Sequence, residues 1–379
     1  MNGRVVVQWL LSAIEPDIGM ERRSIVRFAR QDDYAWFRRQ LQDSLPCYPQ
    51  LGRIVPLGII PAMIFPLPYT TTIPPPLQGM FILEPDESVR IEALPSGSIV
   101  SERGIPWGVG HIGAPSAWSR TTGHKVKVGV IDTGVDFGHP DLRHSLERGI
   151  NLLERMSLPQ DDNGHGTHIA GTIAAANQRH GMIGVAPRAR IHPIKAFDHN
   201  GTAYVSDIIL GIEWCIRNDI DVVNMSFGMK TRSRSLYAAV NSAYRAGVLI
   251  VASSGNDGRT GSIDYPARYH HTIAVGATTR QGRIASFTNR SGLIDVYAPG
   301  ERIVSAWLRG KHREMSGTSM ATSHVTGAAA LLLGLRPSLS PGQLKNIILR
   351  SAVPLKNGRA PRSAGELSVT RMMKLAEQY

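Results

Sequence analysis

The sequence contains only two cysteines, Cys47 and Cys215, among its 379 residues. They stand far apart, and neither lies in a C-x-x-C or comparable metal-binding spacing, so neither a disulfide framework nor a zinc site is indicated. We expect two free thiols, buried or partly buried, without a catalytic role. The lack of disulfides mildly favours a reducing compartment.

Long apolar runs are also absent. No stretch approaches the roughly 18 apolar residues of a transmembrane helix, so no membrane span is expected. The apolar stretch Val5–Ile14 follows a single Arg4, is interrupted by Gln8 and lacks a small-x-small cleavage site. We interpret it as an amphipathic helix rather than a signal peptide. The compartment stays open, with an intracellular location slightly favoured over secretion.

Lysine is missing from residues 1–96, where nine arginines and ten acidic residues give a charge of −1. The remaining residues carry 33 basic and 20 acidic side chains, giving +13. These basic residues are scattered and lack the aromatic interleaving or Arg/Lys-rich helix of a nucleic-acid-binding surface. We therefore expect no nucleic-acid partner. The hydrophobic content of 42% suits an ordinary globular protein, and we expect a monomer.

The first 96 residues predict a small α+β domain. Residues 23–29 favour a strand, and a helix is expected to begin near Asp32. The proline-punctuated stretch 52–68 indicates edge strands, because proline removes a backbone donor from a sheet. Residues 88–94 alternate like a last strand. Residues 97–104 have the composition of a linker.

Residues 105–379 have a different pattern. Short runs rich in valine and isoleucine alternate with helical stretches, which predicts an α/β fold with a doubly wound, mainly parallel sheet flanked by helices. In such folds ligands bind at the carboxyl ends of the strands. Functional residues are therefore expected directly after the apolar runs.

Three polar residues satisfy this expectation. Asp132 ends the run KVKVGVID, although it could instead cap a turn or helix. His165 lies between two glycines at a helix start; His168 follows on the same face, but no H-E-x-x-H motif supports a metal. His165 fits a general base, with His168 packed inside. Asn256 follows a strand and could donate to an oxyanion or serve as a left-handed turn residue.

The stretch EMSGTSMATSHVTG contains six hydroxyl side chains before an apolar helix. It is not the G-x-S-x-G nucleophile elbow of lipase-like hydrolases, because Ala321 stands at the second glycine position. Ser319 would lie at a helix N-terminus, where the exposed N–H groups favour developing negative charge. We expect Thr318 and Thr322 to form hydrogen bonds with the backbone there.

The motifs VIDTGVD, NGHGTHIAGTIA, MSFG, SSGNDG and SGTSMATSHVTGAAAL, in this order, resemble the subtilisin family of serine proteases. The resemblance implies a sheet of about seven parallel strands and a serine endopeptidase that works through an acyl-enzyme. It also implies a triad of Asp132, His165 and Ser319, with Asn256 as the oxyanion donor. A catalytically silent relative would retain the fold, but every triad member is present.

The resemblance extends to the N-terminal region. IPWGVGHIGAPSAWS resembles the start of a mature enzyme, so residues 105–379 would form the catalytic domain. Residues 1–96 would then be a propeptide that acts as intramolecular chaperone and inhibitor, with its C-terminal strand in the active site. We expect autocleavage between Leu94 and Gly104.

By register with the family, extended peptide substrates are expected to pair with Met225–Gly228 on one side and Gly201–Ala203 on the other. One substrate side chain would enter a pocket lined by Ser226–Gly228 and Ala252–Gly255. Asp264 at the pocket base would favour Lys or Arg at the cleaved position, or it could only cap the turn before Tyr265. The implied substrate-binding residues are Gly201, Thr202, Ala203, Met225, Ser226, Phe227, Gly228, Ala252, Ser253, Ser254, Gly255 and Asp264, with Asp257 at the rim.

No cofactor is expected for the chemistry. The family's calcium site is only partly matched: Asp141 is retained, but Gln178 stands where an asparagine ligand is usual and Arg103 where another oxygen ligand is expected. Calcium takes six to eight oxygen ligands, and a guanidinium would oppose it. We therefore expect no calcium ion at Asp141, unless Arg103 is cleaved off or itself takes the place of the ion.

Overall fold

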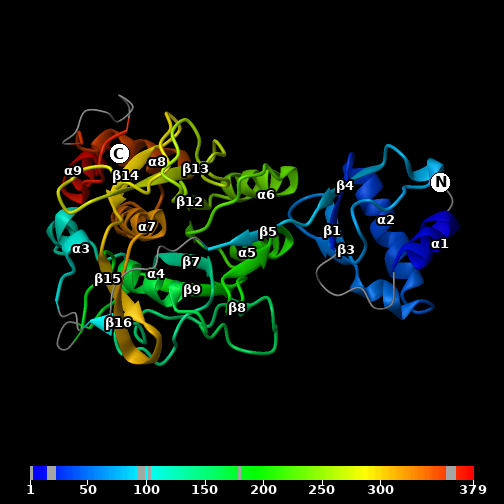
Figure 1. Cartoon of the computed structure of the whole chain (residues 1–379), viewed down its shortest axis with the longest axis horizontal. Coiled ribbons are helices and arrows are strands. Elements are labelled where there is room, and N and C mark those ends of the chain that lie inside the picture. Colours follow the sequence, from blue (N-terminus) through cyan, green and yellow to red (C-terminus); the bar gives the residue numbers. More distant parts are fainter. Residues whose placement is uncertain (1–2, 15–22, 92–98, 101–103, 178–180, 356–363) are drawn as a thin grey trace.

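The computed structural model describes residues 3–14, 23–91, 99–100, 104–177, 181–355 and 364–379. Figure 1 shows a small N-terminal part, in blue, standing beside a larger part that carries the remaining chain. Strand β5 (Ser88–Arg90) reaches from the small part into the large one. No helix among these residues is both long and apolar enough to cross a membrane.

The N-terminal part packs two helices against a four-stranded antiparallel sheet of order β2-β3-β1-β4. Trp9, Phe28, Phe37, Phe65 and Phe81 form an aromatic core between them. Its elements are α1 (Gly3–Ala13), β1 (Ser24–Phe28), α2 (Gln31–Ser44), β2 (Val55–Leu57), β3 (Ala62–Phe65) and β4 (Phe81–Pro85).

One expectation for this part was wrong in part. Strand β2, which contains Pro56, is an edge strand as expected, but strand β3 is internal, because Pro61 and Pro66 flank it and leave its own backbone donors intact. The strand expected at 88–94 is present as β5. It pairs with β10 (Thr202–Tyr204) of the large part, in agreement with the expected place of the last strand of the N-terminal region.

The large part is built on a seven-stranded parallel sheet of order β14-β13-β12-β11-β7-β9-β8, as expected. Only the two-residue strand β8 had no counterpart in the sequence analysis. The strands are β7 (Lys127–Asp132), β8 (Ile150–Asn151), β9 (Arg190–Lys195), β11 (Val222–Met225), β12 (Leu249–Ser253), β13 (Thr272–Thr278) and β14 (Val296–Pro299).

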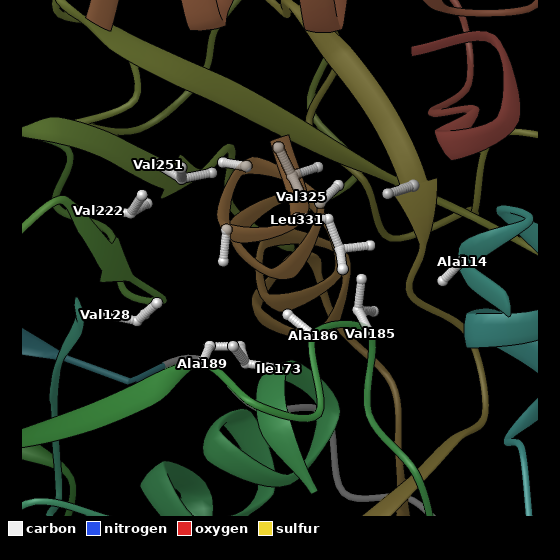
Figure 2. Close-up of a cluster of buried hydrophobic side chains, with 14 of the residues drawn as sticks. Ala114, Val128, Ile173, Val185, Ala186, Ala189, Val222, Val251, Val325 and Leu331 are labelled. Atoms are coloured by element: carbon white, nitrogen blue, oxygen red, sulfur yellow. The ribbon is translucent and has the colours of Figure 1, made fainter. Parts of the chain in front are cut away.

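Helices cover both faces of this sheet, so its strands are apolar throughout. Successive residues of a strand point to opposite faces: Val222 belongs to the core under α4 and α7, whereas Val223 belongs to the core under α5 and α6. Figure 2 shows Val128, Val222 and Val251 converging on α7. The helices are α3 (Trp107–His111), α4 (His165–Ala174), α5 (Val205–Arg217), α6 (Arg234–Arg245), α7 (Thr318–Leu335), α8 (Pro341–Ser351) and α9 (Val369–Leu375).

Helix α7 is buried from Thr318 to Leu333 and crosses the centre of the sheet. A helix can be buried on every side only when other elements of the fold surround it completely. A hairpin of β15 (Ile303–Trp307) and β16 (Lys311–Met315) leads into it, and β6 (Ile99–Val100) adds to this hairpin.

Charged groups of the small part meet the N-termini of two helices of the large part. Asp86 accepts the backbone N–H (2.9 Å) and hydroxyl (2.6 Å) of Ser206 at the start of α5. Glu84 accepts the hydroxyl of Ser235 at the start of α6, at 2.8 Å. Arg23 joins Asp86 to Asp207 through ion pairs of 3.0 and 2.9 Å. Carboxylates are favoured at helix N-termini.

Both cysteines are free, as expected. Cys215 is buried, and burial raises the pKa of its thiol. Cys47 is exposed, which corrects the expectation of a buried or partly buried thiol. It lies just after α2, in the short connection to β2, where few apolar groups cover it.

Candidate active site

Asp132 is the last residue of β7, and its carboxylate contacts His165 at the start of α4. Nδ1 of His165 lies 2.8 Å from Oδ1 and 2.9 Å from Oδ2 of Asp132. Oδ1 also accepts the backbone N–H of Thr133 at 2.8 Å. Both the aspartate and the histidine are buried. Nε2 of His165 has no hydrogen-bond partner among the described residues, so its lone pair is available for a proton.

The two glycines that flank His165 are required by close packing. Gly164 has φ +109°, and a Cβ there would stand 2.4 Å from the ring of Trp307. A Cβ on Gly166 would stand 2.1 Å from the carbonyl oxygen of Gly134. Gly166 therefore lets the helix start approach the end of β7, where His165 reaches Asp132, and Gly164 lets the same helix start pack against Trp307 of β15.

Ser319 is the second residue of α7, which packs against α4. Its hydroxyl donates to the carbonyl oxygen of Ser226 at 3.0 Å rather than to His165. A rotation about the Cα–Cβ bond would redirect the hydroxyl. Catalytic hydrogen bonds often form only in the substrate complex, so this geometry is compatible with a reactive serine.

A buried polar chain that the sequence analysis missed supports this serine. The hydroxyl of Thr326 donates to Asn224 at 2.9 Å, the amide of Asn224 donates to Ser226 at 2.8 Å, and the Ser226 hydroxyl reaches the carbonyl of Ser319 at 3.2 Å. All four residues are buried. The available signal was an asparagine inside the apolar strand DVVNM, since buried amides need partners.

Asn256 follows β12 and lies against the start of α7. Its Oδ1 accepts both the backbone N–H of Thr318, at 2.8 Å, and the Thr318 hydroxyl, at 2.9 Å. These bonds fix the orientation of the amide, with its oxygen toward the start of α7. Thr318 was expected to bond the backbone; its hydroxyl instead orients Asn256. The Thr322 hydroxyl does bond the backbone, at 2.8 Å from the Thr318 carbonyl.

The two segments expected to bind substrate enclose strand β5 of the chain itself. Ala203 pairs with Val89, and Thr202 pairs with Arg90, in antiparallel register. On the other side Arg90 bridges to Gly228. The N–H of Ile91 then donates to the carbonyl oxygen of Gly201 at 2.9 Å. A peptide strand therefore already runs between both edges.

The residues expected to line the pocket divide into two groups. Gly228, Ser254, Gly255 and Asp264 come together: the Asp264 N–H donates to the Ser254 carbonyl at 3.0 Å. A Cβ on Gly228 or Gly255 would stand 2.7 or 2.4 Å from Asp264 Oδ2.

In the second group, the side chains belong to the core on the α5 and α6 face, which leaves only their backbone for a role in the cleft. These residues are Met225, Phe227 and Ala252. Ser253 is buried, and its hydroxyl donates to the Phe227 carbonyl at 3.2 Å.

Asp264 has a cationic partner that the sequence analysis did not consider. The ammonium of Lys230 lies 2.7 Å from Asp264 Oδ2 and also pairs with Asp257. The hydrogen bond from Lys230 holds the pKa of Asp257 below its usual range. The expectation that Asp264 attracts a basic substrate side chain assumed a carboxylate without such a partner.

The described residues around Asp141 do not form a site that fits a calcium ion. Its Oδ1 accepts from Asn177 at 2.8 Å, and its Oδ2 accepts from the Met182 N–H at 3.2 Å and contacts His312 Nε2 at 2.7 Å. Burial raises the pKa of Asp141, but these hydrogen bonds outweigh it and lower the pKa. Arg103 and Gln178 lie outside the described residues.

His139 also lies close, so that His139, Asp141 and His312 bring potential metal ligands within 4.8 Å of one another. However, Nδ1 of His139 accepts the Asp141 N–H at 3.1 Å, and its Nε2 donates to the Lys311 carbonyl at 2.9 Å. A metal would have to displace these bonds. The cluster is a closed hydrogen-bond network.

His168 is packed inside, as expected. Its Nε2 lies 3.1 Å from the carbonyl oxygens of both Ile303 and Arg313. Burial, with the nearby His165 and His324, lowers its pKa to about 3, so the ring is neutral. It anchors the β15–β16 hairpin to α4.

A parallel α/β sheet that gathers an aspartate, a histidine and a serine at strand and helix ends defines the class of serine hydrolases. Within that class, the chain belongs to the subtilase family, whose model matches residues 123–367. It is therefore a subtilisin-type serine endopeptidase, and catalysis in this family needs no cofactor.

Curated relatives agree with this assignment. An alkaline protease of Alkalihalobacillus alcalophilus is 42% identical over 282 residues, covering 72% of this chain and 73% of the relative. Subtilisin Savinase of Lederbergia lenta is 44% identical over 252 residues, covering 66% and 92%. Subtilisin E of Bacillus subtilis (strain 168) is 43% identical over 258 residues, covering 67% of each.

Proposed function

We propose that Asp132, His165 and Ser319 are the catalytic triad and that Asn256 is the oxyanion donor. The observation that carries this proposal is the buried imidazole of His165, held by Asp132 through Nδ1 while Nε2 has no partner among the described residues. Asp132 fixes the tautomer and stabilises the imidazolium that forms. Its burial keeps water from competing for the imidazole.

Catalysis then follows from these positions. Ser319 attacks the peptide carbonyl while its proton passes to Nε2 of His165, and His165 returns the proton to the leaving amine. The amide NH₂ of Asn256 and the backbone N–H of Ser319 stabilise the oxyanion. Water then hydrolyses the acyl-enzyme by the same proton transfers in reverse.

We further propose that residues 1–96 are an intramolecular chaperone and inhibitor, joined by the linker 97–104 to the catalytic domain 105–379. Strand β5 supports this role because it lies where an extended substrate is expected to bind. The described strand reaches the cleft at Ile91. The bond expected to be cleaved, between Leu94 and Gly104, falls mainly on residues outside the described part of the chain.

A preference for Lys or Arg at the cleaved position stays a prediction, and it requires the substrate to displace Lys230 from Asp264. A structural calcium ion is not proposed at Asp141. A monomer stays the expected state.

Labelling with a fluorophosphonate probe tests the active site. We expect the wild type to be labelled at Ser319 and the variant Ser319→Ala to be folded, unlabelled and inactive. Ser323→Ala serves as the matched control, because the Ser323 hydroxyl only donates to the Met320 carbonyl within α7. Labelled or active Ser319→Ala protein would contradict the triad.

The same proteins test processing. The wild type is expected to yield two fragments whose masses locate the cleavage site, whereas Ser319→Ala yields one full-length chain. An uncleaved but active wild type would make the N-terminal region a permanent domain.

A further inference from the structure

The base of the candidate specificity pocket carries a buried charge. Asp264 is 4% exposed and lies directly behind Gly228 and Gly255, two glycines that are expected to line the pocket. A buried carboxylate without a countercharge is strongly destabilising. The fold must therefore supply a cation near Asp264.

Lys230 supplies this cation from a position two residues after Gly228. Its ammonium lies 2.7 Å from Asp264 Oδ2 and also contacts Asp257 at the pocket rim. Nε of Arg259 lies 3.6 Å from Oδ2 of Asp257, the same oxygen that Lys230 contacts. These four side chains, two acidic and two basic, sum to zero charge.

The ammonium stands where a basic substrate side chain would have to bind. A lysine or arginine of the substrate gains an ion pair with Asp264 only by displacing Lys230, whose own pair would then be lost. The Lys230 side chain is 39% exposed, whereas that of Asp264 is 5% exposed. The carboxylate is fixed, and the flexible lysine closes over it.

We propose that Lys230 is a specificity-determining residue: by pairing with Asp264 it reserves the pocket for uncharged side chains. Removing its charge turns the same pocket into one that selects Lys or Arg. This inference rests on the proposed active site, since it requires that the substrate enters between Gly228 and Gly255. It replaces the simpler expectation that Asp264 alone selects basic residues.

The test compares kcat/KM for peptides that differ only in Phe or Arg at the cleaved position. The wild type is expected to prefer Phe, and Lys230→Met to raise the Arg/Phe ratio about tenfold or more, because a desolvated ion pair replaces the internal one. Lys230→Arg, which keeps the charge, is the matched control and is expected to keep the wild-type ratio. In the double variant Lys230→Met/Asp264→Asn, the increase in the Arg/Phe ratio is expected to vanish.

A second variant covers the case in which Lys230→Met does not fold. Asp264→Asn leaves Lys230 without its inner partner, so cleavage after Glu is expected to rise several-fold relative to Phe. Active enzyme in every variant is counted by fluorophosphonate labelling. Absence of labelling in the wild type would refute the proposed active site, not the role of Lys230.

Three outcomes overturn the inference while the active site stands. They are a wild type that prefers Arg over Phe, a Lys230→Met variant with an unchanged ratio, and an Asp264→Asn variant with no change toward Glu. The first would mean that a basic substrate side chain reaches Asp264 in spite of Lys230. Either of the other two would mean that the Lys230–Asp264 pair stabilises the loop without contacting the substrate side chain.

Discussion

At the scale of single residues, the site depends on which polar groups keep an unused atom. His165 and His168 lie one helical turn apart, are both buried, and each has one ring nitrogen without a partner among the described residues, yet only His165 has a carboxylate on its other nitrogen. His168 instead bonds two backbone carbonyls. The difference comes from their neighbours, Asp132 for one ring and the β15–β16 hairpin for the other.

The lowered pKa of His168 predicts acid sensitivity. In the unfolded chain the ring takes up a proton as the pH falls through 6.5, whereas in the fold it stays neutral down to about 3. Stability is therefore fully present above pH 6.5 and decreases between these values, by roughly 1 kcal/mol per pH unit.

Urea unfolding of the Ser319→Ala variant between pH 7.5 and 4.5 measures this slope. Adding His168→Gln, which keeps a donor at the position of Nε2 but does not titrate, is expected to flatten it. His124→Gln, at an exposed histidine, is the control. An equal dependence of stability on pH in all three proteins would contradict the assignment of the acid sensitivity to His168.

At the scale of elements, the apolar periodicity predicted all but one strand of the parallel sheet. Runs such as GVLIVASSG carry their own evidence, because strands covered on both faces must be apolar. Strand β8 has two residues and no such pattern. The triad positions were predicted because glycine-rich motifs mark strand ends and helix starts locally in the chain.

Long-range pairings left no local pattern. Lys230 was not considered because nothing in GMKTR indicates that its ammonium reaches Asp264, 34 residues further along the chain. The pairing of β5 with β10 joins residues more than a hundred positions apart, so the alternation in SVRIEAL predicted only a strand, and its place in the cleft was predicted from the family resemblance. For the Asn224–Ser226–Ser319 network, the asparagine in DVVNM indicated that a partner was needed but not that the network reaches Ser319, 93 residues beyond Ser226.

The start of α4 gives a prediction of its own. Gly164→Ala would place a methyl group 2.4 Å from Trp307 at a position with φ +109°. We expect a loss of about 1–3 kcal/mol in stability. Because the helix start must shift and His165 with it, kcat/KM should fall by about 10²-fold.

Gly110→Ala is the matched control, since its Cβ would meet only Ile105, at 3.9 Å. Both variants are compared by peptide hydrolysis and thermal unfolding. A Gly164→Ala enzyme with wild-type activity would mean that the histidine does not depend on this close approach.

At the scale of the whole molecule, hydrogen bonds to Asp141 connect segments that a calcium ion at this position would otherwise connect. His312 of β16, Asn177 and the Met182 N–H join three segments of the catalytic part through one carboxylate. Their donors point at the oxygens that a cation would need. The arrangement links the loop around Asn177 to the hairpin that leads into α7.

Chelation tests this reading. We expect EDTA to change the melting temperature of the Ser319→Ala protein by less than about 2 °C. A calcium ion present at a free concentration of 100 times its Kd would add ~2.7 kcal/mol to the free energy of unfolding. Its removal would therefore shift the melting temperature by several degrees. A large drop in the melting temperature that added calcium reverses would reveal a calcium site that the described residues do not form.

The strand that lies between Ala203 and Gly228 has a kinetic consequence. Because β5 is tethered to the catalytic part, it acts at an effective concentration in the millimolar range, whatever the dilution of the protein. A free peptide below that concentration cannot compete for the cleft. We therefore expect the onset of activity to follow first-order kinetics, with the same lag time at every protein concentration, until the first released enzymes begin to cut their neighbours.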